Sequence, residues 1–451
     1  MPKTKLHTTF IDKLVPGGFG LGRLADGIVV LVRYALPAEK VVVRETGRRK
    51  DYLTAVLQEV IEPSPDRIVP PCPLYGRCGG CDLQHASPKA QLRLKKALLA
   101  DSLRRAAPDI FHHSMEVLEN PVAAPEQFGY RQRLRLQVDR KGAFGFFRPE
   151  SHSIVPVSHC LLAKENLNIV LGQLSYSPIF KELTRHSHTF ELHFNPGQQS
   201  TVLLLHYQRR PRPADRQLVA ELAEKIDRLS SIIMQVEGYG LYDYKTQTFA
   251  AVPPFLSSTV TIKPLGPALD FSWEVGGFCQ VNLQQNNNLI QLVLDMVHRG
   301  PHRRVLDLFC GHGNFSLPIA LSAGEVVGID AQNASIRSAR ENAQQNRIRN
   351  SRFEKNQVPD AVDSLVAAHE NFDTVILDPP RQGAAEIMSL LPHLGAEQII
   401  YISCNPATLA RDLTVLIPAG YILSRLVPVD MFPQTHHLET VAYLKRNIRG
   451  S

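Results

Sequence analysis

The sequence predicts a multi-domain α/β protein: a small N-terminal antiparallel β-barrel, a central β-rich domain and a C-terminal doubly wound, Rossmann-like domain. Three observations support this prediction. The chain has 451 residues, more than the roughly 100 to 200 residues of one compact core. Short Val-rich and Thr-rich runs alternate with paired glycines near the N-terminus, which is typical of barrels. Longer apolar runs in the last third are typical of parallel strands covered on both faces.

The first two domains are predicted from their strand patterns and from the residues that break them. Residues 6–62 form the barrel, and the Glu-Pro-Ser-Pro stretch at residues 62–65 ends it, so the first domain is placed at residues 1–63. The central domain is expected at residues 64–262. It should contain a cysteine-rich loop, a surface helix over residues 88–105, short strands over residues 130–262 and a helix near residues 215–228.

The third domain, residues 263–451, is predicted from four apolar runs at residues 304–309, 325–329, 374–377 and 398–402. Ligands of doubly wound folds lie outside the carboxyl ends of the parallel strands. The residues that follow each of these runs are therefore the first candidates for a binding site.

The charge balance favours an anionic partner. Lys and Arg number 50 against 43 Asp and Glu, a formal net charge of +7. Residues 1–13 lack the apolar core of a signal peptide, and no run reaches the roughly 18 apolar residues of a membrane-spanning helix, so a cytoplasmic protein without a membrane partner is expected. In such a compartment the seven cysteines indicate metal binding or catalysis rather than disulfides.

Three successive strand ends of the C-terminal domain suggest a nucleoside cofactor. The first strand runs into a turn that contains Gly311 and Gly313, which is a weak signal alone because glycine also serves ordinary tight turns. The next strand ends at Asp330, whose carboxylate can accept hydrogen bonds from ribose hydroxyls. The third ends at Asp378, where two following prolines fix the backbone. Together these strand ends favour a methyltransferase-like cofactor site.

One strand later the sequence places Cys404 between Ser403 and Asn405, at a strand end and just before a predicted helix. A helix N-terminus lowers the pKa of a thiol, so Cys404 is the predicted nucleophile. Cys279 and Cys310 fit better as small buried apolar residues.

A second cysteine set is Cys72, Cys78 and Cys81, with Cys160 far downstream. Three thiols within ten residues, separated by glycines, are typical of a ligand loop. Four thiolates suit zinc or an iron–sulfur cluster, and the spacing does not choose between them. A structural role is favoured over redox turnover.

Residues 128–135 and 145–148 mix arginine with aromatic residues. Such mixtures stack RNA bases and neutralise phosphates, but an ordinary basic strand with its aromatic side chains in the core has the same composition.

Taken together, these residues resemble the bacterial family of RNA uracil-C5 methyltransferases, especially its iron–sulfur members that act on large-subunit ribosomal RNA. The run Ser-Cys-Asn-Pro-Ala-Thr-Leu-Ala-Arg-Asp at residues 403–412 is the most specific part, and the match covers nearly the whole chain. The resemblance implies that the first domain is a TRAM domain, an OB-like RNA-binding barrel, and that the four cysteines hold a [4Fe–4S] cluster. It also implies that residues 90–124 pack on the catalytic domain.

The same resemblance implies that S-adenosylmethionine is the methyl donor, Cys404 the nucleophile and Glu439 the base. The cofactor-binding residues that it implies are Gln280, Phe309, Asn314, Asp330, Asn356 and Asp378. Gln357 is the alternative to Asn356, because either residue fits the local spacing. A thiol is needed because uracil C5 is a poor nucleophile. Its addition to C6 makes an enolate whose charge reaches C5, and a carboxylate must later remove the C5 proton.

Two other interpretations stay open on the sequence. In similar enzymes an Asp-Pro-Pro-Tyr turn directs methylation of exocyclic amines without a thiol, but Arg381 stands where that aromatic residue would be. A non-catalytic RNA-binding assembly factor would share the basic charge and the barrel. Within the uracil-methylating interpretation, 23S rRNA is the expected substrate, tRNA is the alternative, and a monomer is expected.

Overall fold

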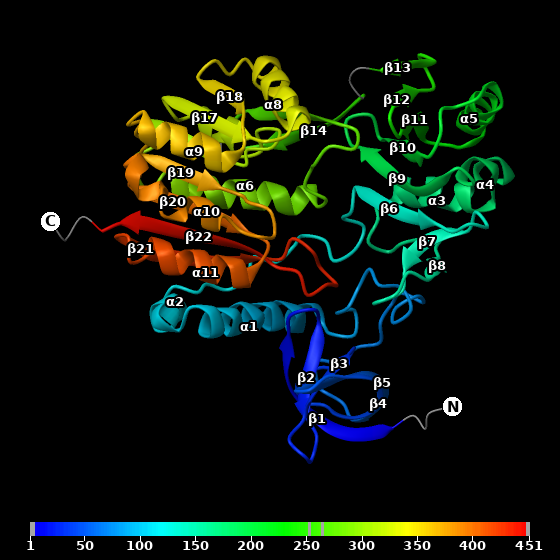
Figure 1. Ribbon diagram of the computed structural model, residues 1–451, viewed down its shortest axis with the longest axis horizontal. Helices are drawn as coiled ribbons and strands as arrows, with labels where there is room; N and C mark the ends of the chain where they lie inside the picture. Colours follow the sequence, from blue (N-terminus) through cyan, green and yellow to red (C-terminus); the bar gives the residue numbers. More distant parts are fainter. Residues whose placement is uncertain (1–4, 251–253, 263–265, 448–451) are drawn as a thin grey trace.

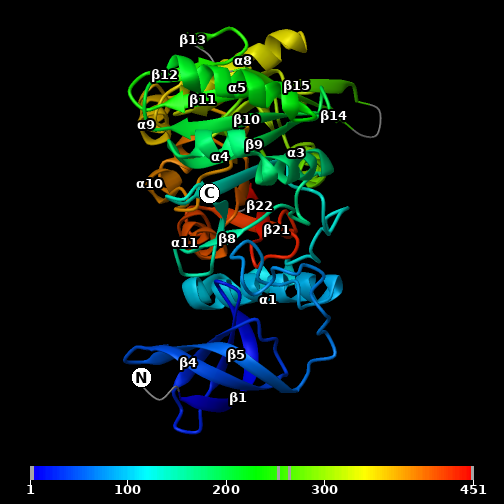
Figure 2. The same cartoon turned by 90° about the vertical axis from the view of Figure 1, so that its right-hand side faces the viewer.

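The computed structural model describes residues 5–250, 254–262 and 266–447. Figure 1 shows three bodies: a small barrel, an eight-stranded sheet and a seven-stranded sheet, the last covered by helices on both faces. The predicted multi-domain α/β fold with an N-terminal barrel is therefore confirmed. Figure 2 shows that the barrel lies at one end of the molecule, separated from the rest by helix α1.

The N-terminal sheet closes in the order β1-β2-β3-β5-β4 around Ile11, Val30 and Val43, which are fully buried. The prediction of an all-antiparallel barrel was wrong, because β3 and β5 pair in parallel. A closed barrel with an odd number of strands cannot alternate direction at every pair, so one parallel pair is required. The strands are β1 (Leu6–Val15), β2 (Phe19–Arg23), β3 (Val29–Arg33), β4 (Lys40–Arg48) and β5 (Tyr52–Glu62).

Helix α1 (Pro88–Ala106) follows a loop that contains Cys72, Cys78 and Cys81. The Ser87 side chain caps its first turn by accepting a hydrogen bond from the Ala90 amide. The sequence predicted a surface helix, but α1 contacts β1 of the barrel, β21 and α11 of the last domain, and Lys95 is fully buried. The helical segments η1 (Pro108–Ile110) and α2 (Phe111–Glu116) follow it.

The eight-stranded sheet has the order β13-β12-β11-β10-β9-β6-β7-β8, and one face packs against three helices. These are α3 (Glu165–Tyr176), α4 (Pro178–Thr184) and α5 (Pro213–Lys225). The predicted helix near residues 215–228 begins earlier because Pro213 occupies its first turn. Helices α3 and α4 were not predicted. The strands are β6 (Arg133–Val138), β7 (Phe144–Phe147), β8 (Ile154–Pro156), β9 (Ser187–Asn195), β10 (Ser200–Tyr207), β11 (Leu229–Val236), β12 (Gly240–Asp243) and β13 (Thr248–Ala250).

A hairpin of β14 (Phe255–Thr261) and β15 (Ala268–Glu274) packs on the other face of this sheet through Leu256 and Trp273. The domain boundary predicted between residues 262 and 263 falls within this hairpin, next to residues 263–265, which lie outside the described residues.

The seven-stranded sheet has the order β18-β17-β16-β19-β20-β22-β21. All pairs are parallel except those made by β22, which runs antiparallel to both neighbours. The four predicted strands are found to within one residue as β16, β17, β19 and β20. The strands are β16 (Arg304–Leu308), β17 (Glu325–Asp330), β18 (Ser351–Lys355), β19 (Thr374–Leu377), β20 (Gln398–Ser403), β21 (Tyr421–Val429) and β22 (Glu439–Arg446).

Helices cover both faces of this sheet (Figure 1). One face packs against α6 (Leu283–Val297), α7 (Ser316–Ala320) and α8 (Asn333–Gln345). The other packs against α1, α9 (Val358–Ala367), α10 (Ala385–Met388), η2 (Leu391–Leu394) and α11 (Pro406–Leu416). Within the part of the chain that the structure describes, no helix is long and apolar enough to cross a bilayer.

Candidate active site and cysteine cavity

The turn after β16 forms the floor of the predicted cofactor site. Phe309 has a φ of 63°, a left-handed conformation that is costly for an aromatic residue and marks a constrained turn. The Asp330 carboxylate, at the end of β17, accepts hydrogen bonds from the amides of Gly311 (3.1 Å) and Gln332 (2.7 Å). The glycine-containing turn and the next strand end are therefore held together by one carboxylate.

The remaining predicted cofactor residues lie at neighbouring strand ends and at the start of α6. Asn314 is buried and exchanges two hydrogen bonds with Asn286 of α6, at 2.8 and 3.1 Å. Gln280 is buried just before the same helix. The Asn356 amide donates to the Asp330 carbonyl at 3.1 Å. The side chains of Asn356 and Gln357 are both exposed, so the choice between them stays a prediction.

A buried carboxylate that the sequence analysis missed lies beneath this site. Asp307, within β16, is fully buried and accepts a hydrogen bond from the Ser316 hydroxyl. Burial raises its pKa to about 7, and burial together with the Asp307 charge raises the pKa of Asp378 to about 7. The sequence could have identified Asp307, because it is the only carboxylate within the apolar run at residues 304–309.

Cys404 lies at the turn between β20 and α11, as predicted, and Asn405 caps the helix by accepting a hydrogen bond from the Ala407 amide at 3.1 Å. The expectation of a lowered thiol pKa was wrong. Burial, and then the charges of Glu439 and Asp378, raise the pKa of Cys404 to about 11, while Arg381 acts in the opposite direction. Desolvation and two nearby carboxylates therefore outweigh the helix N-terminus.

Glu439 is the first residue of β22 and is buried. The antiparallel register pairs Ser403 of β20 with Thr440 of β22, so the next position along the ladder places Cys404 beside Glu439. Burial, and then the Asp378 charge, raise the pKa of Glu439 well above its ordinary value, while Arg381 lowers it. A thiol and a carboxylate far apart in sequence are thus neighbours by strand pairing.

A cavity of about 220 Å³ adjoins Cys404. Arg381 and His437 line it on the catalytic side, Leu98 comes from α1, and Pro16 comes from the barrel. Burial, and then the neighbouring His436, lower the pKa of His437 to about 4, so this imidazole is neutral at pH 7. The sequence analysis gave no role to His437, although the histidine pair just before Glu439 was visible.

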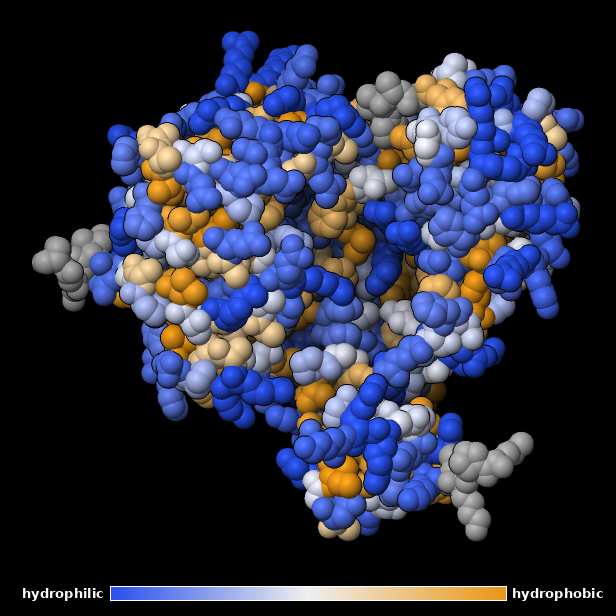
Figure 3. All heavy atoms as spheres, viewed as in Figure 1, coloured by the Kyte–Doolittle hydropathy of each residue, from blue (hydrophilic) through white to orange (hydrophobic). Residues whose placement is uncertain are grey.

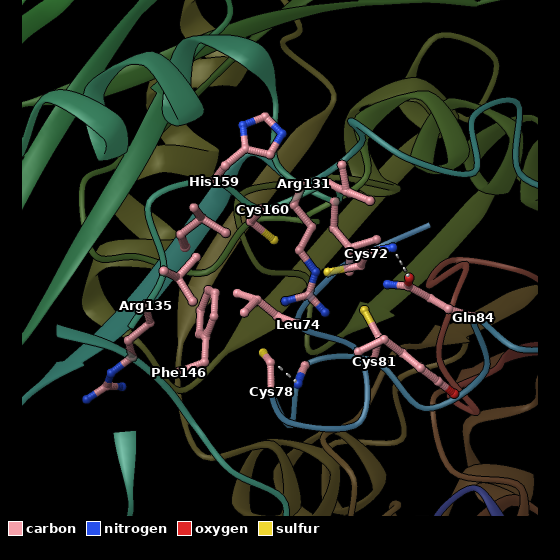
Figure 4. A pocket seen from close by; sticks show the side chains of 16 residues that line it. Cys72, Leu74, Cys78, Cys81, Gln84, Arg131, Arg135, Phe146, His159 and Cys160 are labelled. Atoms are coloured by element: carbon pink, nitrogen blue, oxygen red, sulfur yellow. Dashed lines mark hydrogen bonds between the residues drawn. The ribbon is translucent and has the colours of Figure 1, made fainter. Parts of the chain in front are cut away.

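The four cysteines of the second set line one cavity, also about 220 Å³ (Figure 4). Figure 4 shows their sulfur atoms around a common space into which Arg131 also points. Burial raises the pKa of Cys78, Cys81 and Cys160, to about 12 for Cys81. Among the described residues, no three His, Cys, Asp or Glu side chains are arranged so that they could hold a metal ion. The fold therefore brings the four cysteines to one cavity, but their side chains do not close around a single point.

The two arginine and aromatic runs have different environments. In the first, Tyr130 is buried and donates a hydrogen bond to the Pro433 carbonyl at 3.0 Å, and Arg133 pairs with the buried Glu191 at 2.6 Å. Phe147 and Arg148 of the second run line a hollow of about 520 Å³ that also includes residues of the barrel. Figure 3 shows a mainly hydrophilic face, hollowed between the two large sheets. The second run therefore lines an open hollow, whereas Tyr130 and Arg133 of the first run are bound within the protein.

The chain matches the family model described as tRNA (uracil-5-)-methyltransferase over residues 89–447. It is 35% identical over 447 residues to the 23S rRNA (uracil(1939)-C(5))-methyltransferase RlmD of Pseudomonas entomophila, covering 98% of this chain and 94% of that protein. The protein of the same name from Vibrio cholerae is 34% identical, with 97% and 96% covered.

A solved structure has the same fold. It is the Pyrococcus abyssi tRNA (uracil-54, C5)-methyltransferase in complex with S-adenosyl-L-homocysteine, with a TM-score of 0.71 and 24% identity. The superposition covers 97% of this chain and all of that one.

Proposed function

The chain belongs to the tRNA (uracil-5-)-methyltransferase family, and from this we propose that it methylates C5 of one uridine in 23S rRNA through a covalent bond between Cys404 and the base. It is an RNA uracil-C5 methyltransferase, which excludes both the exocyclic-amine and the non-catalytic interpretations. The rRNA substrate is supported by relatives that match nearly end to end and whose names specify uridine 1939. The tRNA enzyme of known structure supports only the fold.

S-adenosylmethionine is the proposed cofactor, and the residues present fit it. When bound, it supplies an electrophilic methyl group. Asp330 has its orientation fixed by two backbone amides, which leaves lone pairs for ribose hydroxyls. The other residues predicted to bind the cofactor at this edge of the sheet are Gln280, Phe309, Asn314, Asn356 and Asp378.

The pairing of β20 with β22 is the observation that carries the mechanism, because it places a thiol beside a buried carboxylate at the edge where doubly wound folds bind ligands. Addition of the Cys404 thiolate to uracil C6 makes C5 nucleophilic. Once C5 carries the methyl group, Glu439 removes the C5 proton, the C5–C6 double bond re-forms and the thiolate leaves. Arg381 favours both ionised groups, because its charge lowers the pKa of Cys404 and of Glu439.

We also propose that Cys72, Cys78, Cys81 and Cys160 hold a [4Fe–4S] cluster. A single zinc ion binds sulfur at about 2.3 Å and draws four sulfurs into contact, leaving no hollow. The cavity of about 220 Å³ has room for a group of several atoms, which supports a cluster over a single zinc ion. The Arg131 guanidinium would offset the negative charge of four thiolates, and the cluster would join two distant loop segments.

The test is methyl transfer from labelled S-adenosylmethionine to unmodified 23S rRNA fragments and to tRNA transcripts, followed by mass spectrometry of the digested nucleosides. We expect 5-methyluridine in the rRNA fragment only. Methylation of tRNA alone would contradict the proposed substrate, and methylation at another atom would contradict the chemistry.

Glu439→Gln tests the mechanism. The amide cannot accept the C5 proton, so turnover should fall by roughly 10²- to 10⁴-fold while Cys404 still adds to the base. A protein–RNA complex that survives denaturing electrophoresis should accumulate, and Glu439→Gln combined with Cys404→Ala should abolish it. Absence of this complex from the single variant would contradict the assigned roles.

A further inference from the structure

Residues 430–438, which we call the base segment, connect β21 to β22 and end directly before Glu439. Three of these residues, His436, His437 and Leu438, line the cavity beside Cys404. The segment has no helix or strand of its own, so its position depends on contacts with other parts of the chain.

The cysteine loop makes several of these contacts. The amides of Asp82 and Leu83 donate to the Gln434 carbonyl at 3.2 and 3.0 Å. The Asp82 carboxylate accepts a hydrogen bond from the His436 amide at 2.7 Å, and its other oxygen lies 2.5 Å from His436 Nδ1. Asp82 directly follows Cys81, so one peptide bond separates the cysteine cavity from this contact.

Further contacts come from residues just beyond the cysteine loop. Gln91 of α1 exchanges hydrogen bonds with the Gln434 amide (2.9 Å) and side chain (3.0 Å). The fully buried Lys95 forms an ion pair with Asp430 and donates to the Phe432 carbonyl at 2.9 Å. Gln434 itself has a φ of 70°, which a residue other than glycine adopts only when its surroundings enforce it.

Asp82 is also enclosed from the barrel side. A side-chain carbon at Gly18 would lie 2.9 Å from the Asp82 carboxyl carbon, so the barrel turn packs closely against this carboxylate. Asp82 therefore lies where the barrel, the cysteine loop and the base segment meet.

From these contacts we infer that Asp82 is a positioning residue for methyl transfer: it fixes the base segment through His436 and so couples the cysteine cavity to Glu439. Asp82 does not touch the reacting atoms. The inference rests on the proposed role of Glu439, and its experiment has readouts that do not depend on that role.

The experiment compares Asp82→Ala, Asp82→Asn and the control Asp66→Ala, using the full-length protein with its iron content measured. Asp66 is a nearby carboxylate that pairs with the exposed Arg93 and has no contact with the base segment. Hydrogen exchange of peptides covering residues 430–440 is the first readout. We expect at least tenfold faster exchange in Asp82→Ala, an intermediate effect in Asp82→Asn, which keeps one acceptor for the His436 amide, and none in Asp66→Ala.

The second readout is kinetic. Asp82→Ala should lower kcat at least tenfold, leave KM for S-adenosylmethionine unchanged, and accumulate the same covalent RNA complex as Glu439→Gln. In a protein that already carries His436→Ala, the further change Asp82→Ala should have a smaller effect than in the wild type, because only the contact with the His436 amide then remains to be lost.

Wild-type exchange and kcat in Asp82→Ala, or additive losses in the double variant, would overturn the inference. So would loss of iron from Asp82→Ala without faster exchange in residues 430–440. Failure of Glu439→Gln to trap RNA would instead refute the proposed function, and the exchange data would still decide whether Asp82 holds the base segment.

Discussion

The molecule has two sites built on cysteine, and they are organised in opposite ways. Burial raises the pKa of Cys404 in one site and of Cys78, Cys81 and Cys160 in the other, and an arginine lies near each site. Cys404 directly follows β20 of the seven-stranded sheet, and the register of β20 with β22 brings it beside Glu439. The four cavity cysteines lie on segments without helix or strand, around a hollow.

This difference indicates how far the geometry of each site depends on a bound group. The sheet register holds Cys404 and Glu439, the proposed catalytic pair, side by side, and such preorganisation favours catalysis. The cysteine loops are held by the hydrogen bonds of turns rather than by a helix or a strand ladder, so the proposed cluster would also stabilise them. The base segment connects the two sites, because it is bonded to the cysteine loop and leads into β22.

The largest expected effect is a loss of methyl transfer that leaves the site of the other four cysteines unchanged. Cys404→Ala should reduce methyl transfer by at least about 10⁴-fold, because no other thiol can add to C6. Iron content and thermal stability should stay close to wild type, since Cys404 does not line the cavity of the four other cysteines. Cys310→Ala, which removes a buried thiol from the same sheet edge, is the matched control and should keep activity within tenfold. An active Cys404→Ala protein would refute covalent catalysis.

The next effect concerns the connection between the two sites. Lys95→Met should destabilise the protein by about 3 to 5 kcal/mol, because it leaves the Asp430 carboxylate buried without its cation. Unfolding in urea, followed by circular dichroism, measures this loss. Adding Asp430→Leu should recover most of it, since a buried pair replaced by apolar residues is often nearly neutral. A loss below about 1 kcal/mol in the single variant would mean that water reaches Asp430.

The smallest effect is the pH dependence. The reactive form of Cys404 is the thiolate, and its pKa of about 11 means that the thiolate fraction rises about tenfold per pH unit below that value. At saturating S-adenosylmethionine, kcat/KM for RNA should therefore increase roughly 100-fold from pH 7 to pH 9. Iron content should not change over this range, because cluster-bound thiolates do not titrate. A plateau between pH 7 and 8 would contradict a raised thiol pKa in the RNA-free enzyme, because kcat/KM reports the ionisation of the enzyme before RNA binds.

The strands of the last domain could be predicted because each is a continuous apolar run that ends in a polar residue. The same pattern located Asp330, Asp378 and Cys404 at one edge of the sheet. Helix α1 was misjudged because its lysines and arginines suggested exposure, whereas Lys95 is buried against Asp430. Asp82 could not be assigned, since its role depends on His436, a partner more than 300 residues away in the chain.

The sequence alone determined the fold class, the family and the residue types of both cysteine sites, because these depend on local patterns and motifs. Only the tertiary structure decided that Glu439 lies beside Cys404, that the thiol pKa is raised rather than lowered, and that the cysteine loop holds the base segment. Each of these depends on strand register, burial or long-range hydrogen bonds. Such properties arise when distant segments exclude water together, and no local pattern encodes them.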